Sequence, residues 1–122
     1  MNEITRLMQA GGYAFEGLIY LIKEQKNTRL LLITAVLSLI ICPLLGFSAI
    51  ETSVVFFMVI VTTIAEVLNT SIEVTLDLQT QGRYNSKVKI AKDVAACAVL
   101  LGVISSIMVF SIILFANVFA GK

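Results

Sequence analysis

A run of 28 consecutive residues without a charged side chain, residues 94–121, limits most strongly what this chain can fold into. A helix needs about 20 mainly apolar residues to cross the hydrocarbon core of a bilayer. A second run of 21 uncharged residues lies between Arg29 and Glu51, and a third apolar stretch covers residues 54–65. Hydrophobic residues make up 58% of the chain and charged residues 14%, unlike an ordinary soluble domain. These features predict an all-α integral membrane protein.

The composition also excludes several kinds of chemistry. The chain contains no His, which removes His-based acid–base catalysis, catalytic triads and imidazole zinc sites. A net charge of +1, with Lys and Arg in short clusters, gives no basic surface for nucleic acid. Cys42 and Cys97 lie within apolar stretches, which favours buried thiols over a disulfide or metal site. Catalytic chemistry would therefore use carboxylates, amides and lysines.

The first 27 residues predict an amphipathic helix that lies along the membrane surface. Their apolar and polar side chains separate onto two faces at spacings of three and four residues. The apolar face comprises Ile4, Leu7, Met8, Gly11, Phe15, Leu18, Ile19 and Ile22, and the polar face comprises Arg6, Gln9, Tyr13, Glu16, Tyr20 and Lys23.

Three membrane helices are expected after this segment, over residues 29–50, 52–78 and 87–120. Pro43 and Gly46 lie near the expected end of the first, where Pro can kink or end a helix. A polar turn around Gly82 separates the second from the third. We expect a single membrane-embedded domain over residues 1–122.

Positive charge predicts the orientation of these helices. Lys23, Lys26 and Arg29 precede the first crossing, and Arg83, Lys87, Lys89 and Lys92 surround the link between the second and the third. Lys and Arg are enriched in cytoplasmic segments, so both clusters are expected on that side. This multi-pass topology has a cytoplasmic N-terminus and an external C-terminus.

One polar stripe runs along the second predicted crossing. Glu66, Asn69, Glu73 and Asp77 follow one another at spacings of three, four and four residues, within an arc of about 80° on a helix. A charged side chain at membrane depth costs a few kcal/mol, so a stripe with three acids favours function. For Asp77 alone, an equally good interpretation is a carboxylate that is simply solvated at the level of the lipid headgroups.

These side chains suit phosphate and metal chemistry. Carboxylate oxygens can coordinate Mg²⁺ or accept a proton from a nucleophile, and the amide of Asn69 can donate to a phosphate oxygen. Beyond the polar turn, the adjacent Lys92 and Asp93 supply a cation for phosphate and an acid. The chain has neither a P-loop motif nor a GxGxxG motif, so a phosphate site would be built differently.

Two segments carry a family resemblance. AEVLNTSIEVTLDL (residues 65–78) and KIAKDVAACAVLL (residues 89–101) closely resemble the prokaryotic diacylglycerol kinase and undecaprenol kinase family. The family pattern E-[LIV]-[LV]-N-[ST]-[AS]-I-E-x3-D is met from Glu66 to Asp77. The N-terminal segment, with Arg6, Tyr13 and Gly17, and the three predicted crossings are also similar to the family's plan.

The resemblance implies an ATP- and magnesium-dependent lipid kinase in the bacterial plasma (inner) membrane. It further implies a homotrimer whose active sites lie at the cytoplasmic interface between subunits. Matched by position, Glu66 is the general base that activates the lipid hydroxyl, Asn69 contacts the nucleotide phosphates, and Glu73 binds metal. Lys92 and Asp93 serve the nucleotide, as do Arg6, Tyr13 and Tyr84, and Asp77 has a substrate-binding or structural role.

The chain departs from the family pattern in three places. The second metal-binding Glu of the family falls on Gln25, one residue after Glu24, so Glu24 is a candidate metal ligand and Gln25 a substrate-binding or structural residue. Asn85, beside Tyr84, stands where a His is usual. Cys97 occupies a position where Gly is common, and small residues there allow close helix packing.

Two alternatives stay open from the sequence. The lipid substrate can be diacylglycerol or undecaprenol, because both present one primary hydroxyl; the NTSIE segment and the Asp-Leu pair look more like the undecaprenol-type members. In the second alternative the chain is a catalytically silent membrane assembly or cation-binding protein. Gln25 and Asn85 favour this second alternative. The motif residues that are intact oppose it, namely Glu66, Asn69, Glu73, Lys92 and Asp93.

Overall fold

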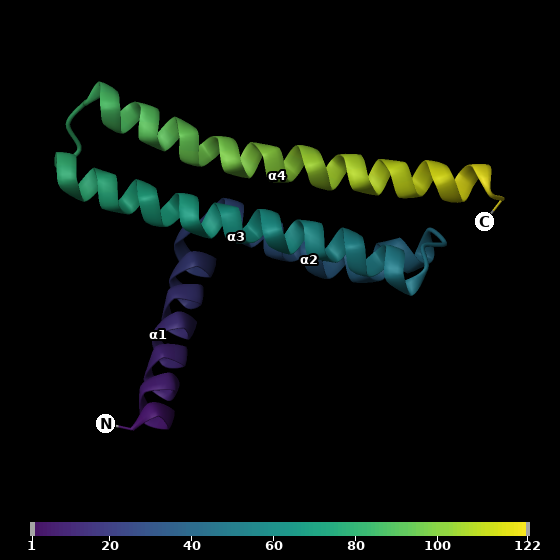
Figure 1. Cartoon of the computed structure of the whole chain (residues 1–122), viewed down its shortest axis with the longest axis horizontal. Coiled ribbons are helices and arrows are strands. Elements are labelled where there is room, and N and C mark those ends of the chain that lie inside the picture. The colour runs from purple at the N-terminus through teal and green to yellow at the C-terminus, as the bar shows by residue number, and fades with distance from the viewer. Residues whose placement is uncertain (1, 122) are drawn as a thin grey trace.

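The computed structural model describes residues 2–121 and contains helices only, as the sequence predicts. Within these residues the chain forms four helices in order (Figure 1). They are α1 (Glu3–Glu24), α2 (Lys26–Leu44), α3 (Ala49–Thr80) and α4 (Ser86–Phe119).

Three of the helices begin at a residue whose side chain caps the free backbone N–H groups of the first turn. The Asn2 side chain accepts a hydrogen bond from the backbone N–H of Thr5 at the start of α1. Ser48 and Glu51 form a reciprocal capping box at the start of α3. Asn85 caps α4 by accepting from the N–H groups of Lys87 and Val88.

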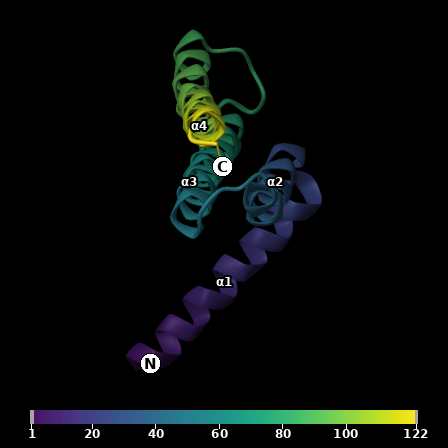
Figure 2. The same ribbon diagram turned by 90° about the vertical axis from the view of Figure 1, so that its right-hand side faces the viewer.

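Helices α2, α3 and α4 form a bundle with α3 in the middle. α3 packs against both α2 and α4, and the end-on view in Figure 2 shows it between them. α1 leaves this bundle at a large angle from the start of α2, and its contacts are with α2 (Figure 1). No residue of α1 is buried, which suits a helix whose apolar face lies in a membrane surface.

The interior of the bundle is more polar than its surface. The buried side chains of α3 share one face and include five polar ones, Thr52, Thr62, Thr63, Asn69 and Thr70, together with Glu66, Val55 and Val59. Leu, Ile, Val and Phe side chains instead project outward, for example Phe57 at 63% exposure. Apolar residues outside and small polar residues between helices are typical of membrane bundles.

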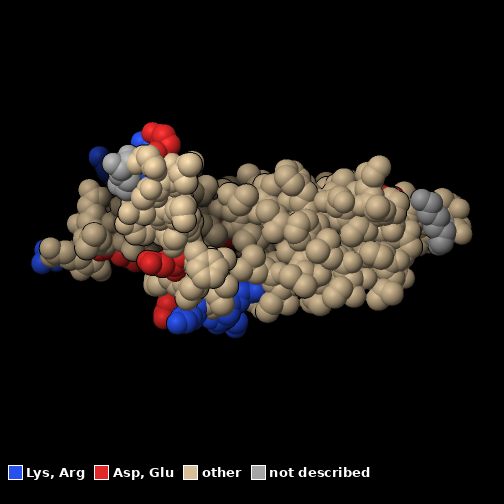
Figure 3. All heavy atoms as spheres, turned by 90° about the horizontal axis from the view of Figure 1, so that it is seen from below, with Lys and Arg blue, Asp and Glu red and all other residues tan. Residues whose placement is uncertain are grey.

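Helices α2, α3 and α4 are each long and apolar enough to cross a membrane. α3 has 32 residues and α4 has 34, so each spans about 50 Å at roughly 1.5 Å per residue, more than the hydrocarbon core of about 30 Å. Their charged ends therefore extend past the apolar layer. Figure 3 shows Lys, Arg, Asp and Glu gathered at one end of the molecule and an almost entirely uncharged surface elsewhere.

The apolar core lies at the opposite end of the bundle. Phe47, in the turn between α2 and α3, packs with Cys42 and Val55. Its ring lies 5.4 Å from that of Phe110 on α4, measured between ring centroids. The Asn117 amide donates to Glu51 at 3.4 Å, which links α4 to the first turn of α3. These contacts hold all three long helices together at this end.

The helix bounds differ from the predicted ranges, most clearly for the first crossing. The predicted range 29–50 becomes Lys26–Leu44, because the chain turns at Gly46, whose φ is 89°, and α3 begins after its Ser48 cap. The predicted range 52–78 becomes Ala49–Thr80, 87–120 becomes Ser86–Phe119, and 1–27 becomes Glu3–Glu24. Pro43 fits within the last turn of α2.

Gln25 alone separates α1 from α2. It adopts an extended conformation, with φ −116° and ψ 105°, so one residue makes the change in direction. The Arg29 guanidinium group donates to the carbonyl oxygens of Ile22 and Lys23, at 2.8 and 2.9 Å. A cation on the last carbonyl groups of a helix stabilises that end, so Arg29 holds α1 against the start of α2.

Candidate functional site

The predicted stripe on α3 lies on one helix face and runs from the interior to the surface. Glu66 and Asn69 are buried, at 5% and 7% exposure, Glu73 is half-buried and Asp77 is exposed. The amide of Asn69 donates to the Glu73 carboxylate at 3.2 Å. The structure therefore brings four of the predicted site residues into one continuous polar row.

Glu66 faces the start of α2. A side-chain hydrogen bond joins it to Asn27, and its carboxylate is close enough to Glu73 for the two charges to repel. Burial of a carboxylate is costly unless it has a polar partner, and here the partner Asn27 comes from α2. The joint between α1 and α2 is thus in contact with the most buried acid of the stripe.

Several buried oxygens of the bundle have no hydrogen-bond partner within the described residues. They are Oδ1 of Asn69, Oγ1 of Thr70, Oγ1 of Thr52 and Oγ1 of Thr28, whose side chain is completely buried. A buried polar atom without a partner costs about 1–3 kcal/mol. Asn69 belongs to the stripe and Thr70 follows it directly, so this region keeps unused hydrogen-bonding capacity beside its carboxylates.

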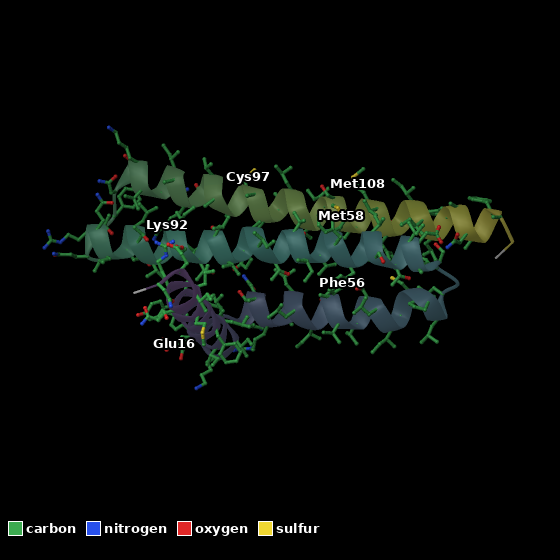
Figure 4. All side chains as sticks on the ribbon, turned by 60° about the horizontal axis from the view of Figure 1, so that its bottom comes forward. Glu16, Phe56, Met58, Lys92, Cys97 and Met108 are labelled. Carbon is green, nitrogen blue, oxygen red and sulfur yellow. The ribbon has the colours of Figure 1, made fainter. Side chains whose placement is uncertain are left out.

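A pocket of about 400 Å³ lies at the α3–α4 turn. Its lining includes three cations, Arg83, Lys89 and Lys92, with Asp77, Thr80, Tyr84 and Asn85. Tyr84 is 81% exposed, so its ring can stack on a planar ligand. Lys92 forms an ion pair with Asp77 that connects α4 to α3. Figure 4 shows Lys92 at this end of the bundle.

The two charged residues predicted on α4 have different surroundings. Lys92 reaches across to α3, whereas the carboxylate of Asp93 pairs with Lys89 of its own helix at 2.6 Å. Both side chains of the second pair are about 60% exposed. Asn85 has a structural task as the cap of α4, which accounts for an Asn at this position.

The site residues predicted on α1 and at its end have fewer contacts with the rest of the molecule. Arg6 pairs with Glu3 of the same helix, and Tyr13 is 70% exposed. Glu24 is the exposed last residue of α1, and Gln25 is the half-buried link to α2. Among residues 2–121, no group of three or more Cys, Asp and Glu side chains is placed to hold a metal ion.

Sequence reasoning missed three residues of this region: Asn27, Thr28 and Thr70. Asn27 contacts Glu66, and the two threonines are buried without a hydrogen-bond partner in the described part of the chain. Thr70 follows Asn69 directly and could have been found from its place on the stripe. Which residues of α2 contact the stripe depends on how α2 is aligned along α3. The helical periodicity of a sequence does not give the alignment between two helices.

The comparisons with known proteins agree with these observations. The family described as prokaryotic diacylglycerol kinase matches residues 12–114. A protein of Synechocystis sp. named "Diacylglycerol kinase" is 37% identical over 97 residues, which make up 80% of this chain and 55% of that protein. The chain thus spans about half the length of the curated relative it matches.

Proposed function

Because this chain belongs to the prokaryotic diacylglycerol kinase family, we propose that it is a lipid kinase. In this proposal it transfers the γ-phosphoryl group of ATP to the primary hydroxyl of a membrane lipid, at the cytoplasmic face. The observation that carries the proposal is the row of Glu66, Asn69 and Glu73, which runs from the buried interior toward the basic pocket at the turn.

Glu66 is proposed as the general base. Its carboxylate accepts the proton of the lipid hydroxyl while that oxygen forms a bond to the γ-phosphorus, and the bond from this phosphorus to the β–γ bridging oxygen breaks to release ADP. The side chain is 5% exposed and bonded to Asn27. Such burial keeps water from the proton acceptor, which favours transfer to a lipid over hydrolysis of ATP.

The residues present fit a divalent cation with oxygen ligands. Glu73 offers a half-buried carboxylate, and Oδ1 of Asn69 is buried, unpartnered in residues 2–121 and one helical turn away. We propose that Glu73, with Glu24 as a second ligand, holds Mg²⁺. When bound, Mg²⁺ neutralises charge on the phosphate oxygens and usually retains several water ligands.

We assign the nucleotide to the pocket at the α3–α4 turn. The ammonium groups of Lys92 and Lys89 and the guanidinium group of Arg83 suit phosphate, and Tyr84 suits the flat face of a base. Asn69 would donate to phosphate from the stripe, and Asp93 would contact the nucleotide from α4. The proposal also retains Arg6 and Tyr13, which would approach from α1.

The proposal also covers the lipid substrate and the oligomeric state of the protein. Diacylglycerol and undecaprenol both present a primary hydroxyl, and the exposed apolar side chains of the bundle suit either hydrocarbon. We propose a homotrimer, with a cytoplasmic N-terminus and an external C-terminus, in the bacterial plasma (inner) membrane. The support for the trimer is the family resemblance, and a mass measurement in detergent that finds single chains would contradict it.

An assay of ATP-dependent lipid phosphorylation tests the function. Purified protein in mixed micelles is given diacylglycerol or undecaprenol with radiolabelled ATP, in the presence of Mg²⁺ or of a chelator. We expect a phosphorylated product from one lipid, and no product with the chelator. Absence of product from both lipids would contradict the kinase and favour a silent cation-binding protein, with Gln25→Glu and Asn85→His as the first variants to make.

A further inference from the structure

We propose that Asp77 is a positioning residue that holds the Lys92 ammonium group at the wall of the α3–α4 pocket, ready to contact nucleotide phosphate. This inference rests on the proposed function, because it takes this pocket as the nucleotide site. In this inference Asp77 acts on the nucleotide by orienting Lys92, and it does not itself bind the metal or the lipid.

The ion pair differs from the other pairs formed among residues 2–121. Asp77 lies near the end of α3 and Lys92 in the second turn of α4, so the pair spans two helices. The remaining pairs, Lys89 with Asp93 and Arg6 with Glu3, join residues of one helix. Both Asp77 and Lys92 also line the pocket.

Lys92 is more confined than its neighbour. Its side chain is 34% exposed, compared with 61% for Lys89. A lysine side chain has four flexible methylene groups, and without a partner its ammonium group would sample many positions in water. The carboxylate of Asp77 selects the positions in which the ammonium group points across the turn toward α3.

This pairing leaves Lys92 able to bind phosphate. An ammonium group has three N–H donors, and the hydrogen bond to Oδ1 of Asp77 uses one of them. The pocket wall carries three cations, Arg83, Lys89 and Lys92, and one acid, Asp77. The wall is therefore net positive, and a polyanionic ligand is attracted to it with the ion pair intact.

The position of Asp77 connects the two parts of the site. It follows Glu73 by four residues and so continues the row that begins at Glu66. Through the ion pair, the same helix face carries the proposed base, the proposed metal ligand and the anchor of the phosphate-binding lysine. Asp77 thereby sets the distance between the transferred phosphoryl group and the base.

Steady-state kinetics with varied ATP test this inference. We expect Asp77→Asn to raise KM for ATP about fivefold, the size of a good solvent-accessible ion pair, with kcat changed less than about twofold. Asp77→Glu should restore much of the wild-type KM. The double variant Asp77→Asn with Lys92→Gln should be no worse than Lys92→Gln alone. Glu16→Gln on α1, which removes the same charge from an exposed site, should leave both constants unchanged.

Several results would overturn the inference. An unchanged or lowered KM in Asp77→Asn would show that the acid does not orient Lys92, or competes with phosphate for it. Additive effects in the double variant, or a large fall in kcat at unchanged KM, would assign Asp77 a role independent of Lys92. These outcomes require active wild-type protein, whereas wild-type protein that phosphorylates neither lipid would overturn the proposed function itself.

Thermal unfolding of each variant accompanies the kinetics. The Asp77 side chain is 58% exposed, so its replacement should leave the unfolding temperature unchanged. A KM effect that occurs only together with a lowered unfolding temperature, and that Asp77→Glu does not reverse, would contradict positioning.

Discussion

Burial changes along a single helix face from Glu66 to Asp77, and this gradient determines what each acid can do. Glu66 is enclosed and bonded to Asn27, Glu73 is half-exposed, and Asp77 reaches solvent and pairs with Lys92. The order of these residues on one face could be predicted from their spacing. Their partners could not, because Asn27 and Lys92 lie on other helices and the sequence contains no measure of how those helices are aligned.

Gln25, the single residue between α1 and α2, gives a prediction about metal binding. Gln25→Glu should lower the Mg²⁺ concentration needed for half-maximal activity about tenfold, because an added anionic ligand strengthens binding of a hard cation. Glu24→Gln should raise that concentration by a similar factor if Glu24 is the second ligand. The measurement is lipid phosphorylation as a function of Mg²⁺ concentration. If neither variant shifts the curve, the joint contributes no metal ligand.

The sequence predicts the number and the type of the helices well, and the positions of their ends less well. Long uncharged runs bounded by charges identify three crossings, and the alternating faces of residues 3–24 identify α1. The end of α2 was predicted at residue 50 because the apolar run continues to Ile50, but Gly46 and the Ser48 cap place it at Leu44. Hydropathy records which residues tolerate lipid, and backbone conformation decides where a helix ends.

The contact between α3 and α4 depends on Gly102. A Cβ atom at this position would lie 2.7 Å from Oγ1 of Thr62, whose hydroxyl is hydrogen-bonded to Ser106 at 3.1 Å and whose side chain is 2% exposed. Gly102→Ala should therefore lower the free energy of unfolding by about 1–3 kcal/mol. Denaturation in mixed detergent measures this change.

Gly11→Ala is the matched control for that experiment. A Cβ atom at Gly11 meets nothing within 4 Å, and Ala is favoured over Gly in a helix by about 1 kcal/mol. This variant should be neutral or stabilising. Equal destabilisation by both substitutions would contradict close packing of α3 and α4 at Gly102.

The angle between α1 and the bundle depends on Arg29. Arg29→Ala removes both hydrogen bonds to the last carbonyl groups of α1, so residues around the joint should exchange backbone hydrogens faster. Lys26→Ala removes a nearby exposed cation and is the control. Hydrogen exchange in lipid nanodiscs reports the result, and equal exchange in both variants would show that Arg29 does not fix α1.

At the scale of the whole molecule, charge and apolar surface are segregated along the long axis. Charged side chains collect on the half of the molecule that carries α1, the start of α2 and the α3–α4 turn, and the far end carries the apolar core (Figure 3). The sequence predicted this polarity from its charge clusters. It did not predict which helix lies in the middle of the bundle, because the choice of α3 follows from its buried polar face.

Accessibility of single cysteines tests the predicted orientation. In a background with both Cys42→Ser and Cys97→Ser, a cysteine at Gln79, near the α3–α4 turn, should react with a membrane-impermeant thiol reagent only from the cytoplasmic side. A cysteine at Ala49, at the start of α3, should react only from outside. The reverse pattern would place the proposed site on the wrong side of the membrane for ATP.

The central claim is that Glu66 accepts the proton in phosphoryl transfer to a lipid, and its replacement is the most direct test. Glu66→Gln, compared with Glu51→Gln at the opposite end of α3, removes one carboxylate from the same helix. We predict a loss in kcat of at least about 100-fold for Glu66→Gln and near wild-type turnover for Glu51→Gln, with both variants folded. Lipid phosphorylation by folded Glu66→Gln at the wild-type rate would contradict it.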